Sequence, residues 1–358
     1  MQRLKSIDSY RGLMILLMVW VHLTDWWLIA SDRWFFDLTY VLVDRIFAPG
    51  FLFISGLSAT LLVRKRIKDG TDVKIVRSQY FLRSLFILVI AIIFNISVAI
   101  GAGDPSLIWT WFILFTLAIS LLMIYPLLKL NKIARSIIAI ALWIANYYIL
   151  LLLAPFQGQA NFFGVLYHLL FNSLNLEPIL SNFSYVIIGS VIGDIIFDIY
   201  KIENRDQANA ALKKRVLYPL LIMGLILIPL GIFAEFPWSD TYATFSWKAL
   251  SLGTCFILFS LFVAYEIYGK SKFKRDYRFF YYFSFYSFTT YLGHFLLYFL
   301  FLHMLHVIYA CFLIPLSMFL IFILLRIIYK SKWRYSFSLK VQLGRLSSGL
   351  TERIYKIE

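Results

Sequence analysis

The feature that most constrains this chain is the alternation of long apolar runs with short polar loops. A helix that crosses the ~30 Å hydrocarbon core of a bilayer needs about 20 predominantly apolar residues. About ten runs approach or exceed that length. They cover residues 11–30, 44–63, 80–100, 107–127, 135–153, 180–198, 216–234, 247–268, 279–300 and 306–328. The pattern predicts an all-α, polytopic integral membrane helical bundle with about 10 transmembrane helices.

Lys and Arg occur almost entirely in every second loop. Of the 34 such residues, only Arg33, Arg45 and Lys248 fall in the other loops. Positively charged loops stay in the cytoplasm, so both basic termini are predicted to be cytoplasmic in a multi-pass protein of the cell membrane. The net charge of +15 then reflects topology and contact with membrane lipid. No nucleic-acid partner is expected, because no groove-reading motif is present.

The organisation along the chain is simple. We expect a single transmembrane domain over residues 1–330, followed by a basic cytoplasmic tail over 331–358 that lies on the inner leaflet. Segment 161–172 is apolar but short for a crossing, and we interpret it as an outer interfacial or re-entrant helix. The two cysteines lie inside apolar runs, and neither a disulfide framework nor a metal motif is visible, so no metal is expected.

Ionisable side chains inside membrane spans are costly and therefore point to function. Asp25 follows His22 by three residues on nearly the same helix face, so its carboxylate could orient the imidazole as a general base. Alternatively, His22 hydrogen-bonds a neighbouring helix and Asp25 caps a helix end. His294 lies ~22 Å from the inner start of its run at 1.5 Å per residue, at a similar depth. These three residues are the predicted catalytic group.

Basic residues at the inner side form a second candidate group. A polyphosphate ligand would suit them through charge-assisted hydrogen bonds, although topology alone explains most of them. The predicted cofactor-binding residues are Arg11, Arg64, Arg77 and Arg83. Arg11 precedes His22 by ~16 Å along a helix. On the opposite side, Asp44 and Tyr291 are expected to face the substrate.

Several motifs resemble the transmembrane acyltransferase superfamily. The opening RLKSIDSYRGL (residues 3–13) leads to MVWVH (18–22), and Arg11 and His22 show that group's spacing of Arg, ten residues, His. HLTDWW (22–27), FAPGFLFISG (47–56) and YLGH (291–294) resemble heparan-α-glucosaminide N-acetyltransferase and its prokaryotic relatives. Pro and Gly within 47–56 also predict either close helix packing or local unwinding.

The resemblance implies an acyl-CoA-dependent O- or N-acyltransferase. It would move an acyl group, most simply acetyl, from cytoplasmic acetyl-CoA to a hydroxyl or amine of an extracytoplasmic carbohydrate or glycolipid acceptor. Arg11 and Arg83 would bind the CoA phosphates, while His22 would take the acceptor's proton or relay the acyl group. The chain departs from the animal enzyme, which has Asn where His22 stands and its key His further on in the outer loop. It also lacks a large luminal domain.

Two other functions fit parts of the pattern. A proton-coupled secondary transporter could use His22 and Asp25 as a proton relay, but its usual inverted repeat is not visible. A non-catalytic scaffold would leave the buried ionisable residues unexplained. The sequence leaves open the acceptor, the acyl chain length, direct transfer against an acyl-enzyme, and whether the protein forms a homodimer.

Overall fold

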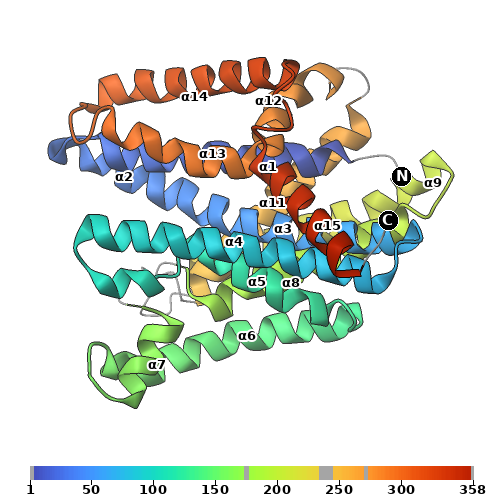
Figure 1. The fold of residues 1–358 in the computed structure, drawn as a ribbon, viewed down its shortest axis with the longest axis horizontal. Coiled ribbons are helices and arrows are strands. Elements are labelled where there is room, and N and C mark those ends of the chain that lie inside the picture. Colours follow the sequence, from blue (N-terminus) through green and yellow to red (C-terminus); the bar gives the residue numbers. More distant parts are fainter. Residues whose placement is uncertain (1–3, 173–176, 234–244, 270–272, 356–358) are drawn as a thin grey trace. The chain divides into compact units, whose positions relative to one another are not determined.

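The structure, a computed structural model, describes residues 4–172, 177–233, 245–269 and 273–355. Within these ranges every regular element is a helix, and the β-type pairing is limited to an isolated bridge between Leu28 and Leu305 (Figure 1). The predicted all-α fold class is therefore confirmed.

Most of the described chain is in long helices. These are α1 (Lys5–Trp27), α3 (Arg45–Lys68), α4 (Val73–Ala102), α5 (Ile113–Leu127), α6 (Lys132–Leu153), α8 (Ile179–Ile199), α10 (Tyr218–Phe233), α11 (Phe245–Tyr268), α12 (Phe273–Phe285), α14 (Val307–Lys330) and α15 (Leu339–Tyr355). Shorter segments join them. These are η1 (Ala30–Asp32), α2 (Arg33–Thr39), η2 (Tyr40–Asp44), η3 (Pro105–Trp109), η4 (Ala154–Phe156), α7 (Phe162–Leu170), α9 (Arg205–Leu212), η5 (Lys213–Leu217), α13 (Ser287–Gly293) and η6 (His294–Phe299).

All ten predicted runs fall on helical segments, and eight of the stretches in the described residues are long and apolar enough to cross a membrane. The protein is thus a multi-pass membrane protein. The first and ninth predicted runs are not among the eight. Helix α1 is long enough, but Arg11, His22 and Asp25 lower its mean hydropathy. The number of crossings and the cytoplasmic position of the termini stay predictions.

The ninth predicted run, 279–300, is a broken helix rather than one continuous span. Helix α12 ends at Phe285, and Tyr286 has φ −98° and ψ 20°, outside the helical region. Helix α13 then gives way after Gly293 to the tighter 3₁₀ helix η6, which begins at His294. A break in a membrane helix is tolerated where neighbouring groups satisfy the freed backbone, and it often marks a functional position.

The chain forms two compact units. Unit 1 contains the described residues of 1–51 and 255–345, and unit 2 contains those of 52–254 and 346–358. Helices α3 and α11 therefore contribute residues to both units. In unit 2, α6 packs on α8 and α5 packs on both α4 and α8, as Figure 1 shows.

The core of unit 1 is built around α1, which packs mainly against α12 and also contacts α13 and α14. Ile15 and Leu16 of α1 meet a group of aromatic side chains from α12 and the residue that follows it, among them Phe283 and Tyr286. The approach is close because Gly12 has no side chain: a Cβ there would lie 2.1 Å from the carbonyl oxygen of Phe280.

Glycines also bring α3 and α8 together within unit 2. A Cβ on Gly56 would lie 2.0 Å from the carbonyl oxygen of Val186, and one on Gly189 would lie 2.0 Å from that of Phe53. Small residues at a membrane helix interface allow this backbone approach. Because α3 is helical from Arg45 to Lys68 despite Pro49, residues 47–56 serve close packing, and the alternative of local unwinding is wrong.

Large apolar side chains are exposed in rows along four helices. These include Ile92, Ile93, Ile96 and Ile100 on α4, Ile133, Ile137, Ile140 and Ile144 on α6, Ile222, Leu225 and Ile226 on α10, and Ile308, Phe312 and Phe319 on α14. Surfaces this apolar are unfavourable in water but suit lipid chains, which are as apolar as these side chains.

Segment 161–172 and the predicted tail each contain a helix, α7 and α15 respectively. Helix α7 has nine residues, too few to span a bilayer, so the expected short helix within 161–172 is confirmed while its place at the outer interface stays a prediction. In the predicted tail, Ser338 donates to the carbonyl of Phe285 at 3.1 Å in unit 1, and Thr351 contacts Ser78 at 3.2 Å in unit 2.

Candidate active site

Helix α1 presents two of the predicted catalytic side chains and one predicted phosphate ligand. Its N-terminus is fixed by Glu266 of α11, whose carboxylate accepts from the backbone N–H groups of Lys5 at 3.0 Å and Ser6 at 2.9 Å. A carboxylate at this end satisfies free amides and complements the positive end of the helix dipole. The helix that carries Arg11 and His22 is therefore anchored at its start within unit 1.

The two predicted catalytic histidines meet each other. Nδ1 of His22 lies 2.7 Å from Nε2 of His294, although 272 positions separate them in the sequence. The two rings are nearly parallel, at an interplanar angle of 19°, and their centroids are 4.9 Å apart, so with this short N···N distance they meet edge to edge. His294 is buried with 2% of its surface exposed. Because the broken ninth run places His294 at the start of η6, the break positions this residue against α1.

The hydrogen bonds of His294 assign the protons of both rings. Nδ1 of His294 bonds the carbonyl oxygen of Tyr291, which can only accept, so Nδ1 carries the proton. A buried imidazole whose contacts in the described structure include no carboxylate is neutral, which leaves Nε2 of His294 as an acceptor. Nδ1 of His22 must then donate, and Nε2 of His22 keeps its lone pair. The chain from carbonyl to His294 to His22 therefore leaves an oriented base at Nε2 of His22.

Aromatic rings surround the histidine pair. Trp26 lies 5.4 Å from His294 between ring centroids, at an interplanar angle of 16°, and 5.3 Å from His22. Phe47 and Phe295 flank His22 at 6.1 Å each. Apolar walls of this kind lower the local dielectric and so strengthen hydrogen bonds formed inside them.

Asp25 does not orient His22, and the expectation of a His22–Asp25 couple needs correction. Its carboxylate forms an ion pair with Arg33, the first residue of α2, and Arg33 also donates to the carbonyl oxygen of Asp25 at 3.0 Å. Both side chains of this pair are more than a third exposed, so the pair contributes little to stability. The partner of His22 is His294, and Asp25 ties α1 to α2.

The two predicted substrate-side residues are placed differently. Tyr291 is buried and supplies the carbonyl that fixes the His294 tautomer, so it acts through its backbone. Asp44 ends the π-helical segment η2, and its side chain lies outside the described part of the structure.

Arg11 lies in a polar group at the other end of α1, with 14% of its side chain exposed. Its guanidinium lies 3.8 Å from Asp8 and donates to Ser284 of α12 at 3.4 Å, and Ser284 donates to Asp8 at 3.2 Å. Lys340, at the start of α15, donates to the carbonyl of Ser284 at 3.1 Å. The sequence did not indicate Ser284 or Lys340, since nothing local links them to Arg11.

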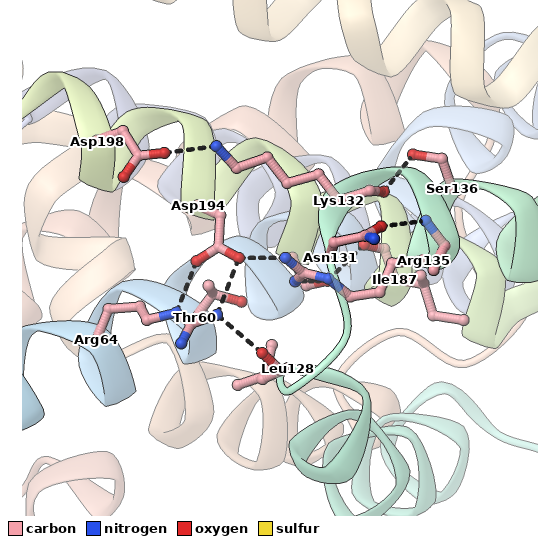
Figure 2. Close-up of polar contacts among 12 residues, drawn as sticks. Thr60, Arg64, Leu128, Asn131, Lys132, Arg135, Ser136, Ile187, Asp194 and Asp198 are labelled. Atoms are coloured by element: carbon pink, nitrogen blue, oxygen red, sulfur yellow. Dashed lines mark hydrogen bonds and ion pairs between the residues drawn. The ribbon is translucent and has the colours of Figure 1, made fainter.

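The other three predicted phosphate ligands belong to unit 2. Arg77 is exposed on α4 and lies over the ring of Phe81 at 5.9 Å, and Arg83 is half-buried one to two turns further along α4. Arg64 forms an ion pair with Asp194 of α8 at 2.8 Å. The structure does not gather these three around a common point; Arg64 instead joins a separate group of charges shown in Figure 2.

Sequence reasoning also missed a buried lysine at the start of α11. Lys248 is 2% exposed and donates to Asn182 of α8 at 3.0 Å. Glu177, just before α8, is close enough for Lys248 to act on its charge: burial raises the pKa of Glu177 to about 7, and Lys248 opposes that rise. A charged residue within the apolar run 247–268 is the same signal that identified His22, so it could have been found.

The fold and the paired histidines define a polytopic helical membrane protein with a buried candidate acid–base site. Residues 3–230 match the family described as heparan-alpha-glucosaminide N-acetyltransferase, catalytic. The chain belongs to this family of membrane acetyltransferases. The match includes α1 with Arg11 and His22, whereas Tyr291 and His294 lie beyond it. No curated protein matches the chain.

Proposed function

We propose that the protein transfers an acetyl group from cytoplasmic acetyl-CoA to a hydroxyl or amine of a carbohydrate or glycolipid on the opposite side of the cell membrane. The observation that supports this most is the 2.7 Å contact between Nδ1 of His22 and Nε2 of His294, from which we infer that Nε2 of His22 carries no proton. Family membership supports the acetyl group and the CoA donor. The transporter alternative is not favoured, because the chain belongs to an acetyltransferase family.

In the proposed reaction His22 acts as a general base and then as a general acid. Its Nε2 accepts the proton of the acceptor's O–H or N–H as that oxygen or nitrogen attacks the thioester carbonyl carbon. The C–S bond breaks, and the leaving thiolate takes the proton from Nε2, which returns His22 to its starting form. His294 stabilises the transient imidazolium by accepting from its Nδ1–H.

The donor's phosphates are assigned to the Arg11 end of α1. Arg11 and Lys340 both contact Ser284 there, which supplies two cations to a polyphosphate. Arg11 precedes His22 by ~16 Å along α1 at 1.5 Å per residue, roughly the reach of an extended pantetheine arm. The thioester could then lie beside His22 while the nucleotide stays at the cytoplasmic end.

The test uses purified protein in lipid nanodiscs, [¹⁴C]acetyl-CoA and glucosamine, since an α-glucosaminide is the acceptor in the family's name. We expect labelled sugar and released thiol from the wild type, and neither above background from His22→Ala. His168→Ala on α7 is the matched control and should behave as the wild type. Full turnover by a folded His22→Ala variant would remove His22 from the mechanism.

A further inference from the structure

A cavity of ≈ 590 Å³ opens within unit 2, between the C-terminal part of α3, the N-terminus of α6 and the C-terminal part of α8. Its charged lining comprises Arg64, Lys132, Arg135, Asp194, Asp198 and Lys201, most of which appear in Figure 2. All four cations belong to loops predicted to be cytoplasmic. The cavity belongs to unit 2, whereas the histidine pair belongs to unit 1, and its proposed role does not depend on acyl transfer.

The charges are arranged in two tiers along α8. Asp194 pairs with Arg64 at 2.8 Å and with Arg135, whose side chain is fully buried (0% exposed). Four residues on, Asp198 pairs with Lys132 and, at 2.9 Å, with Lys201; these two lysines are 41% and 53% exposed. Each carboxylate is thus bracketed by two cations, and the lining keeps a net charge of +2.

Setting the orientation of the protein in the membrane does not require this arrangement of charges. Lysines and arginines that only set orientation can remain in water, whereas burying Arg135 beside Asp194 carries a desolvation cost that the ion pair must offset. The carboxylates fix the arginines in place without neutralising the cavity. A preorganised excess of positive charge is a property of anion sites.

Residues that line this cavity also carry donors without acceptors. Nε of Arg135 is buried and has no hydrogen-bond partner in the described structure. At the N-terminus of α6, Asn131 accepts from the amides of Ala134 and Arg135. The amides of Lys132 and Ile133 have no acceptor among the described residues, and both residues line the cavity. The first turn of a helix with free amides favours a bound anion.

We infer that this cavity binds a phosphate ester, held by the Lys132 and Lys201 ammonium groups and the first-turn amides of α6 over the buried Arg135. A phosphate monoester carries a charge that matches the excess of +2, and its oxygens only accept, as the unpaired donors require. The cavity is larger than one phosphate and has an apolar wall that includes Phe197 and Ile133, so it can hold the remainder of the molecule. An anionic phospholipid headgroup and a soluble nucleotide share this chemistry.

The test measures binding to full-length protein in nanodiscs for two probes. Adenosine 3′,5′-bisphosphate is titrated by calorimetry in phosphatidylcholine discs, and co-purified phosphatidylglycerol is counted by native mass spectrometry in mixed discs. The test variant is Lys132→Gln/Lys201→Gln, which alters the exposed lysines and leaves the buried arginines in place. Lys68→Gln/Lys74→Gln, which removes the same charge from exposed positions outside the cavity, is the control.

We expect one of the probes to lose about tenfold or more in affinity or retention in the test variant but not in the control, because two charge-assisted contacts are removed. Loss of bisphosphate binding identifies a soluble phosphate ester, and loss of phosphatidylglycerol identifies a lipid headgroup. Equal effects in the two double variants, or binding of neither probe by the wild type, would overturn the inference. Because acetyl transfer is not measured, these results are independent of the His22 test.

Discussion

Replacing His294 by Ala isolates the role of the histidine pair, because it removes the partner of His22 without altering His22 itself. The Nδ1–H of His22 then loses its acceptor at 2.7 Å, and nothing fixes the proton on Nδ1 rather than Nε2. A ring protonated on Nε2 cannot act as a base at that atom. An oriented general base contributes about 10²–10⁴-fold to rate, so we expect kcat to fall by roughly that range.

The variant His294→Gln provides a graded comparison. The side-chain amide oxygen of Gln can lie near the position of the imidazole Nε2 and accept from His22. One such hydrogen bond is worth about 1 kcal/mol, so His294→Gln should turn over roughly fivefold faster than His294→Ala. The expected order of kcat, from highest to lowest, is wild type, His294→Gln, His294→Ala.

The assay is initial-rate release of CoA thiol in nanodiscs, with acetyl-CoA varied at saturating glucosamine. The KM for acetyl-CoA should change little, since the histidine pair does not contact the donor's phosphates in the proposed complex. His303→Ala is the matched control for histidine loss in the same unit. Wild-type kcat in a folded His294→Ala variant would refute the reasoning that His294 orients the base.

Three further outcomes follow from the packing and the charges. Arg11→Ala should raise the KM for acetyl-CoA by about 10–100-fold with a smaller effect on kcat, since a charge-assisted contact is worth about 1.5–3 kcal/mol; an unchanged KM would remove Arg11 from the donor site. Gly12→Ala should lower the thermal midpoint by the equivalent of about 1–3 kcal/mol, because its Cβ would overlap the Phe280 carbonyl, whereas Gly101→Ala, with open space around it, should not. Asp194→Asn should destabilise the protein by about 3–5 kcal/mol in reversible unfolding, because it leaves two arginines without their counter-charge; a loss below about 1 kcal/mol would show that the pair is not structural.

The helical bundle could be predicted from the sequence because its signal is local. A run of about 20 apolar residues has few alternatives to a membrane helix, and the described residues of each predicted run lie mostly in helices. The break near Tyr286 could not be predicted, since neither Pro nor Gly stands there and the local composition is that of a continuous helix. The Tyr286 hydroxyl donates to the carbonyl of Arg334 at 2.9 Å, and local sequence patterns do not report a contact between residues 48 positions apart.

The candidate site likewise has features that could be predicted from the sequence and features that could not. His22 and His294 could be found one at a time, because ionisable side chains are rare in apolar runs. Their pairing could not, since 272 positions separate them, whereas Asp25 lies three residues from His22 and looks like the natural partner. In the structure α2 brings Arg33 to Asp25, so the Asp25 carboxylate forms an ion pair with Arg33 rather than a hydrogen bond to the imidazole. The pairing of Arg135 with Asp194 could not be predicted from the sequence for the same reason, since 59 positions separate these residues.

The proton positions of the two imidazoles test the central claim most directly. Nitrogen-15 NMR of histidine-labelled protein in nanodiscs distinguishes a protonated ring nitrogen from one with a lone pair, and the loss of a signal in His22→Gln assigns it. We expect both rings to be neutral at pH 7 and both protonated on Nδ1, with the lone pair of His22 on Nε2. A His22 protonated on Nε2 would contradict the account, because the group proposed to accept the acceptor's proton would already carry one.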